Sequence, residues 1–170
     1  MQNLNFLDPQ SISILIQLLV AMLLGTILGI ERTIAHKTAG MRTYALISTG
    51  AALFVIISEI IFLKYASFSA INPLLLPAQI VVGIGFIGGG LIFVHGNTVK
   101  GLTTAAGLWV MAGIGMAVGY KLYTIAIFAT ILTLFIFKVL WRIEDQIKHF
   151  VGTNDECTID HKGEVKCKGE

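Results

Sequence analysis

Long apolar stretches dominate the first 140 residues of the chain, and short polar segments separate them. Five of these stretches are close to the roughly 20 residues that a helix needs to cross a hydrocarbon core of about 30 Å. They comprise residues 12–30, 44–63, 74–94, 102–120 and 122–140. Because none shows the period-two alternation of a lipid-facing barrel strand, the pattern predicts membrane helices.

Only Lys121 separates the last two stretches. A single helix across both would greatly exceed the thickness of a bilayer, so we expect a tight helical hairpin here. The predicted fold class is therefore all-α: a polytopic membrane protein with five transmembrane helices. We expect a membrane domain over residues 1–141 and a short polar cytoplasmic tail over residues 142–170.

Composition supports this interpretation and excludes other classes. The chain is 55% hydrophobic and only 13% charged, whereas soluble domains carry about 25% charged residues. The net charge of +2 is too small to indicate a nucleic-acid partner. The lipid bilayer is thus the expected surrounding of most of the chain.

Basic residues are distributed unevenly between the two sets of loops. Ten of the 12 lysines and arginines follow the first or third stretch or lie from Lys138 onward, and only Lys64 and Lys121 lie in the opposite loops. By the positive-inside rule, the N-terminus is expected outside and the C-terminus in the cytoplasm.

Glycine recurs inside the apolar stretches. It weakens a soluble helix by up to about 1 kcal/mol, but it lets membrane helices approach one another closely. We therefore predict a glycine-rich bundle with the third stretch at its centre. The glycines expected at helix contacts are Gly25, Gly29, Gly83, Gly85, Gly88, Gly89, Gly115 and Gly119.

Several motifs, in order along the chain, resemble those of a bacterial family. They are GTILGIER at 25–32, KTAGMRT at 37–43, GAALF at 50–54, AQI at 78–80 before the glycine run, and GLTTAA at 101–106 with Trp109. Over roughly residues 12 to 125 the chain is similar to the MgtC/SapB family of bacterial inner-membrane proteins. The resemblance implies a five-helix membrane domain linked to magnesium homeostasis, to virulence, and to interference with the rotary ATP synthase.

The chain departs from the family pattern in two places. Family members usually carry an Asp-Pro-x-Arg-like element before the third span, where this chain has Asn72-Pro73-Leu74-Leu75 and lacks the charge pair. Many members also close with a cytoplasmic ACT-like domain, for which the residues after the last stretch are too few. The resemblance therefore implies a short form without that domain.

Three polar side chains lie at a similar depth in three of the stretches. Counting 1.5 Å per residue, Gln17, Glu59 and Gln79 lie about 6 to 8 Å below the outer ends. Because a carboxylate within a membrane is costly, it marks a functional site by default. This intramembrane polar layer could bind a cation, or Glu59 could pair with Lys64 while the glutamines make interhelical hydrogen bonds.

A second polar cluster is expected at the cytoplasmic helix ends. Glu31 ends the first stretch, where the helix macrodipole disfavours a carboxylate, so Arg42 or Lys37 is expected to compensate it. The cluster comprises Glu31, Arg32, Lys37, Arg42, Thr43, Thr103 and Thr104. It could bind a phosphate-bearing ligand or an anionic lipid head group, hold hydrated Mg²⁺ through Glu31, or form a salt-bridged collar between the first two helices.

The tail contains both cysteines of the chain. A hairpin turning at residues 161–163 would place Cys157 opposite Cys167, although disorder is the stronger expectation. With His161 between them, their spacing matches no established zinc site. The metal, if any, stays unknown, and no resident cofactor is expected.

The sequence does not support an enzymatic function. The GxGxxG at residues 83–88 lies inside an apolar stretch and lacks the acidic residue that a dinucleotide site requires. We predict a regulatory or homeostatic membrane factor that contacts a membrane-protein partner. The chain could also form homo-oligomers. The alternative is a small Mg²⁺ transporter or channel subunit. Since few polar groups lie between the two polar layers, the sequence favours the regulator.

Overall fold

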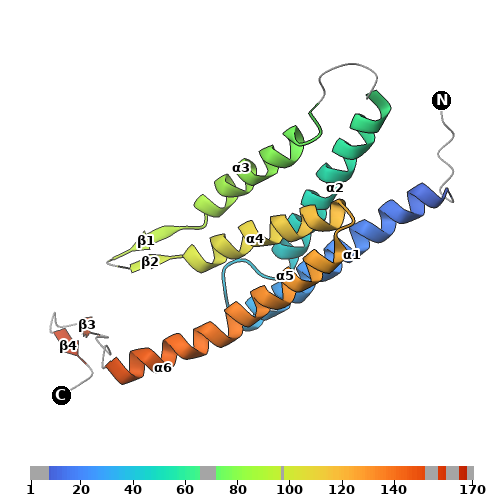
Figure 1. The fold of residues 1–170 in the computed structure, drawn as a ribbon. Helices are drawn as coiled ribbons and strands as arrows, with labels where there is room; N and C mark the ends of the chain where they lie inside the picture. Colours follow the sequence, from blue (N-terminus) through green and yellow to red (C-terminus); the bar gives the residue numbers. More distant parts are fainter. Residues whose placement is uncertain (1–7, 66–71, 97, 152–156, 160–164, 168–170) are drawn as a thin grey trace. The chain divides into compact units, whose positions relative to one another are not determined.

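A computed structural model describes residues 8–65, 72–96, 98–151, 157–159 and 165–167. The chain divides into two compact units, Met1–Thr133 and Leu134–Glu170. Five apolar helices start within the first unit (Figure 1). A short β-hairpin joins the third helix to the fourth. The helices are α1 (Pro9–Ile34), α2 (Met41–Tyr65), α3 (Leu75–Gly89), α4 (Leu102–Gly119) and α5 (Tyr123–Phe135).

The predicted all-α membrane fold is confirmed. By length and composition, α1, α2, α4 and the helical run from Tyr123 to Glu144 can each cross a membrane, and α3 is a shorter apolar helix. The predicted hairpin is also confirmed, because α4 ends at Gly119 and α5 begins at Tyr123. Lys121 makes the turn in the left-handed region, with φ of 62°.

The third apolar stretch forms a shorter helix than the predicted span over residues 74–94. α3 ends at Gly89, and β1 (Phe93–His95) then pairs antiparallel with β2 (Thr98–Lys100). Consecutive glycines at residues 88–90 end the helix, since glycine is a weak helix former. The 15 residues of α3 extend about 22 Å, less than the hydrocarbon thickness of about 30 Å.

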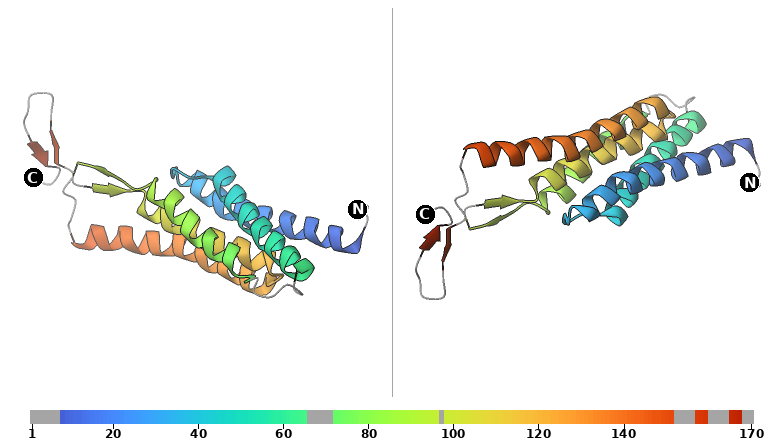
Figure 2. Two further views of the ribbon diagram at one scale, coloured as in Figure 1. Left: turned by 90° about the horizontal axis from the view of Figure 1, so that it is seen from above. Right: turned by 90° about the horizontal axis from the view of Figure 1, so that it is seen from below.

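The centre of the first unit is α4, which packs against α1, α2 and α3 (Figure 2). More than half of its residues are buried, whereas Pro77, Ile84 and Gly88 are the buried residues of α3. The prediction that the third stretch lies at the centre is therefore wrong. Glycine content indicates that a helix can be approached closely, but it does not say whether protein or lipid approaches it.

Four glycines of α1 and α4 lie at close contacts with α2. A Cβ atom on Gly29 would lie 2.4 Å from the Met41 Cα atom, and one on Gly115 would lie 2.3 Å from the Ser48 carbonyl oxygen. Gly25 lies as closely against the Tyr44 carbonyl oxygen, and Gly119 lies against the Val55 side chain and the Ala52 carbonyl oxygen. These four positions hold α1 and α4 against α2 at distances that only glycine permits.

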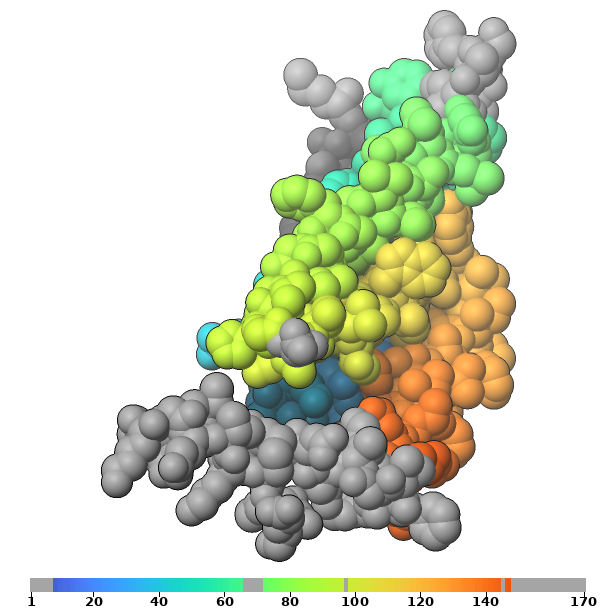
Figure 3. All heavy atoms as spheres, turned by 90° about the vertical axis from the view of Figure 1, so that its left-hand side faces the viewer, coloured from blue at the N-terminus to red at the C-terminus, as the bar shows by residue number. Residues whose placement is uncertain are grey.

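The glycines of α3 lie in different surroundings. A Cβ atom on Gly83, Gly85 or Gly89 would meet no atom within 4 Å. On Gly88 it would lie 3.5 Å from the Ala105 side chain, an ordinary van der Waals contact. Figure 3 shows α3 along one face of the first unit, with its outward surface uncovered.

The second unit contains a π-helical turn, η1 (Ile136–Leu140), followed by α6 (Trp141–Val151) and a β-hairpin. The hairpin pairs β3 (Cys157–Ile159) with β4 (Val165–Cys167) and places Cys157 opposite Cys167, which confirms the predicted register. Its turn at residues 161–163 lies outside the described residues. The structure gives the tail the helix α6 and these two strands.

Candidate functional site

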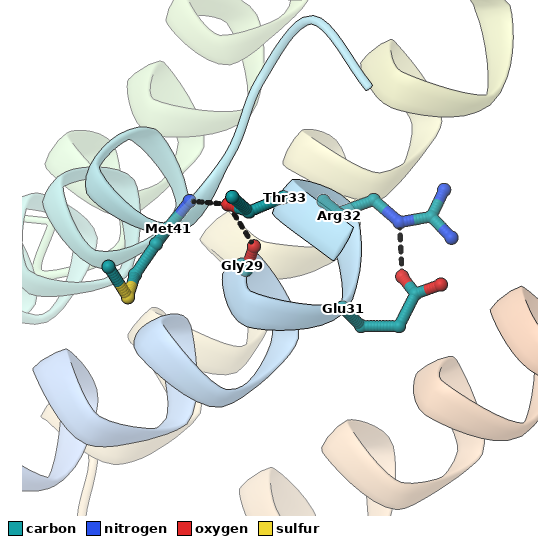
Figure 4. Close-up of polar contacts among 5 residues, drawn as sticks. All are labelled: Gly29, Glu31, Arg32, Thr33 and Met41. Carbon is teal, nitrogen blue, oxygen red and sulfur yellow. Dashed lines mark hydrogen bonds and ion pairs between the residues drawn. The ribbon is translucent and has the colours of Figure 1, made fainter. Parts of the chain in front are cut away.

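The end of α1 carries a buried ion pair. The Arg32 Nε atom donates a hydrogen bond to the Glu31 carboxylate (Figure 4), and the Arg32 side chain is almost wholly buried. The positive partner of Glu31 is thus its chain neighbour, and the predicted compensation by Arg42 or Lys37 is wrong. Both of those side chains are exposed, and in the part of the chain that the structure describes neither pairs with Glu31.

A hydroxyl group links this helix end to the start of α2. The Thr33 Oγ1 atom donates to the Gly29 carbonyl oxygen at 2.9 Å and accepts a hydrogen bond from the Met41 backbone N–H at 3.1 Å (Figure 4). It thereby satisfies one of the backbone donors that a helix start leaves unpaired. Sequence reasoning missed Thr33, although its position four residues after Gly29 permits the bond to that carbonyl.

The other residues of the predicted cytoplasmic cluster differ in burial. Thr104 is buried, Thr43 is half-buried, and Thr103 is exposed. Two hydroxyl groups on α2 outside the predicted cluster are also buried. The Tyr44 and Ser48 hydroxyls find no hydrogen-bond partner among the described residues, and their spacing of four places them on one face of α2.

At the opposite end of the unit, α1, α2 and the α4–α5 turn line a partly open cavity of about 130 Å³. It brings together two members of the predicted intramembrane layer, Gln17 and Glu59, and excludes Gln79, which is exposed on α3. Gln17 is 1% exposed, and its Nε2 atom donates to the Gly119 carbonyl oxygen at 3.2 Å. The remaining polar lining comes from Gln10, Ser13 and Lys121.

Glu59 does not form the ion pair with Lys64 that we considered from the sequence. The Lys64 ammonium group instead lies 5.6 Å from the centre of the Tyr65 ring. Burial, with a smaller contribution from the Glu59 carboxylate, raises the pKa of Tyr120 in the adjoining turn. A phenol is already protonated at neutral pH, so the Tyr120 hydroxyl can donate a hydrogen bond.

A second cavity, of about 300 Å³, lies between α3, α4 and α5. Among the described residues, those that line it are apolar and include Val81, Ile84, Trp109 and Ile125. It offers room for apolar groups and contributes no polar chemistry. In the described ranges, no group of three or more His, Cys, Asp or Glu side chains is placed to hold a metal ion.

Apolar helices packed through glycine contacts, with ionisable groups at both ends of the bundle, define the chain as a multi-pass helical membrane protein. The sequence pattern of the MgtC family matches residues 18–146, and the chain belongs to that family. No solved structure matches it.

The chain is similar to three curated relatives over most of its length. YhiD of Escherichia coli K12, named as a candidate magnesium transporter, is 39% identical over 76% of this chain and 61% of its own. Protein MgtC of Salmonella typhimurium is 45% identical over 71% of this chain and 49% of its own. The uncharacterised slr0014 of Synechocystis is 39% identical over 92% and 64%. The chain thus spans about half to two thirds of these relatives.

Proposed function

We propose that the chain is a regulatory factor in magnesium homeostasis in the bacterial inner membrane, and that it acts by contacting a partner membrane protein such as the rotary ATP synthase. The name of one relative, the candidate magnesium transporter YhiD, supports the link to magnesium. The observation that carries the proposed mode of action is the closely packed centre of the bundle.

The polar groups at the two ends of the bundle are separated by backbone contacts. Between them, Gly115 of α4 lies directly against the backbone of Ser48 in α2. Nearer the outer end, Gly119 lies against the Val55 side chain and the Ala52 carbonyl oxygen. Ala51 and Ala52 are buried beside them. A hydrated cation needs a continuous row of polar groups or water to cross a membrane, because a charge in hydrocarbon is costly. This packing favours a factor that acts through contacts over one that conducts.

The exposed surface of α3 supports the proposal that the chain contacts a protein partner. Val82 is 67% exposed and Phe86 is 85% exposed, and Gly83 on the same face has open space around it. In a bilayer, close packing of small residues against another helix is a main source of association. A face that combines glycine with an exposed aromatic ring fits another membrane helix, from the partner protein or from a second copy.

The cytoplasmic ends of the helices supply the charged part of the proposed contact. With the N-terminus outside, as the distribution of basic residues favours, the Glu31–Arg32 pair and the exposed Lys37 and Arg42 lie on the cytoplasmic side. These exposed cations can attract an acidic protein segment or an anionic lipid head group. No enzymatic activity and no resident cofactor form part of the proposal.

A small Mg²⁺ transporter or channel subunit is the second candidate function. The name of YhiD favours it, as do carboxylates at both ends of the bundle, Glu31 and Glu59. This candidate requires a second conformation or an oligomer in which the contact between α2 and α4 opens.

Reconstitution separates the two functions. The purified chain is placed in liposomes that enclose a Mg²⁺-sensitive dye, and its gene is tested for rescue of growth in low magnesium. We expect rescue of growth without Mg²⁺ influx above that of empty liposomes. Influx that disappears in a Glu59→Gln variant would establish the transporter instead, and failure to rescue growth would contradict the magnesium role.

A further inference from the structure

The cavity between α1, α2 and the α4–α5 turn has features that a regulatory role does not explain. Its volume of about 130 Å³ is ample for a small polar group or for several water molecules. One wall is the α1 face with Gln10, Ser13 and Gln17, and the other is the α2 face with Glu59. The cavity is thus lined by amides, a hydroxyl and a carboxylate in a segment where most side chains are apolar.

Two side chains of opposite charge line this cavity without contacting each other. Glu59 and Lys121 both belong to its lining, yet in the described part of the chain no ion pair joins them. Glu59 is half-buried in a membrane-length helix, where an ionised group is costly unless it has a partner. An anionic and a cationic group held apart in one small cavity match a ligand that carries both charges.

The cavity lies a few ångströms inside the surface of the hydrocarbon layer. Glu59 lies six residues before the end of α2 at Tyr65, which is about 9 Å along the helix. With 25 residues, α2 extends about 37 Å, so its ends reach into the head-group regions on either side of a hydrocarbon core of about 30 Å. Ile56, Ile60 and Leu63 provide apolar walls beside the polar groups.

We propose that this cavity binds a small zwitterionic group with a primary ammonium next to a phosphate or carboxylate. The Glu59 carboxylate accepts hydrogen bonds from the ammonium group, and Lys121 pairs with the anion. Such charge-assisted hydrogen bonds are stronger than neutral ones. A phosphatidylethanolamine head group presents this chemistry from within the membrane, and a soluble amino acid or phosphoethanolamine presents it from water.

A bare cation fits the cavity less well than a zwitterion. Mg²⁺ is usually held by carboxylates or phosphates and retains several waters, and here a single carboxylate shares the lining with an ammonium group that repels cations. The two ligands therefore predict opposite effects of removing Lys121. Neutralising Lys121 weakens the binding of a zwitterion and strengthens the binding of a divalent cation.

The test measures lipid selectivity. The full chain is reconstituted in phosphatidylglycerol nanodiscs that contain phosphatidylethanolamine or, at the same fraction, phosphatidylcholine, and retained lipid is measured by native mass spectrometry. The quaternary ammonium of choline cannot donate hydrogen bonds. We expect retention of phosphatidylethanolamine over phosphatidylcholine by about tenfold, the scale of one charge-assisted hydrogen bond.

Three substitutions test whether the preference for phosphatidylethanolamine arises in the cavity. Glu59→Gln is expected to abolish the preference, whereas Lys121→Gln is expected to weaken retention of both zwitterionic lipids. Lys64→Gln, a basic residue near the same helix end but outside the cavity lining, serves as the matched control and should retain the preference. If Glu59→Gln fails to fold, the Lys121→Gln variant in the exposed turn still tests the proposal. Weaker retention of both lipids supports it, and unchanged retention contradicts it.

The source of the zwitterion is distinguished by adding phosphoethanolamine or glycine to nanodiscs of phosphatidylglycerol alone. Calorimetric binding that requires both Glu59 and Lys121 would indicate a soluble ligand, and its absence beside lipid selectivity would indicate the lipid. Equal retention of both lipids with no binding of either soluble compound would overturn the proposal. So would Mg²⁺ binding that becomes tighter in Lys121→Gln.

Discussion

Among single residues, Arg32 places the strongest constraint on its surroundings, because its guanidinium group is buried while its charge persists. Glu31 is its adjacent anionic partner. We predict that Glu31→Gln lowers the free energy of unfolding by about 1.5–3 kcal/mol, the range for a hydrogen bond to a charged group. Unfolding in detergent, followed by circular dichroism against denaturant, measures this change.

Arg42→Gln is the control for that measurement. Arg42 is exposed at the start of α2, and exposed substitutions usually change stability by less than about 0.5 kcal/mol. We expect its stability to match the wild type. Equal destabilisation by both substitutions would mean that the two cations share Glu31, contrary to the arrangement described above.

Sequence reasoning located polar residues better than it located their partners. Counting helical rise placed Gln17 and Glu59 at one depth, and they do line one cavity. Gln79 has a comparable depth but lies on α3, away from that cavity. Depth follows from distance along a helix, whereas the direction of a side chain depends on how the helix is rotated and on what it packs against.

At the scale of helices, the glycines of α4 and α3 make a direct comparison possible. We predict that Gly115→Ala lowers stability by about 1–3 kcal/mol, the usual cost of overpacking, because its Cβ atom would collide with the Ser48 carbonyl. Gly85→Ala should leave stability unchanged or slightly higher, since a Cβ atom there meets nothing. The melting temperature of each purified variant measures the difference, and a destabilising Gly85→Ala would mean that α3 is covered within the monomer.

The boundaries of the helices could be predicted from the sequence more readily than their positions in the bundle. Long apolar runs fix where a membrane helix can form, which is why α1, α2, α4 and the α4–α5 turn follow the pattern. A helix that is apolar on all sides gives no indication of its buried face. The central position of α4 arises from close contacts between its glycines and α2, and the sequence alone did not distinguish these glycines from those of α3.

For the whole molecule, the proposed orientation can be checked through the tail. In a Cys167→Ser variant, Cys157 is the remaining cysteine. We predict that a membrane-impermeant maleimide fails to label it in intact cells and labels it after permeabilisation, because the basic residues favour a cytoplasmic tail. Labelling in intact cells would reverse the orientation and place the Glu31–Arg32 pair outside.

The central claim is that the chain acts through a contact in the membrane, and photo-crosslinking from α3 tests it most directly. A photoreactive benzoylphenylalanine replaces Phe86, which is 85% exposed, and in a second variant replaces the buried Ile84 as control. In cells that grow in low magnesium, we predict an adduct between the Phe86 position and a membrane subunit of the rotary ATP synthase, with none from Ile84. Rescue of growth without a protein adduct from Phe86 would contradict the proposed contact through this face.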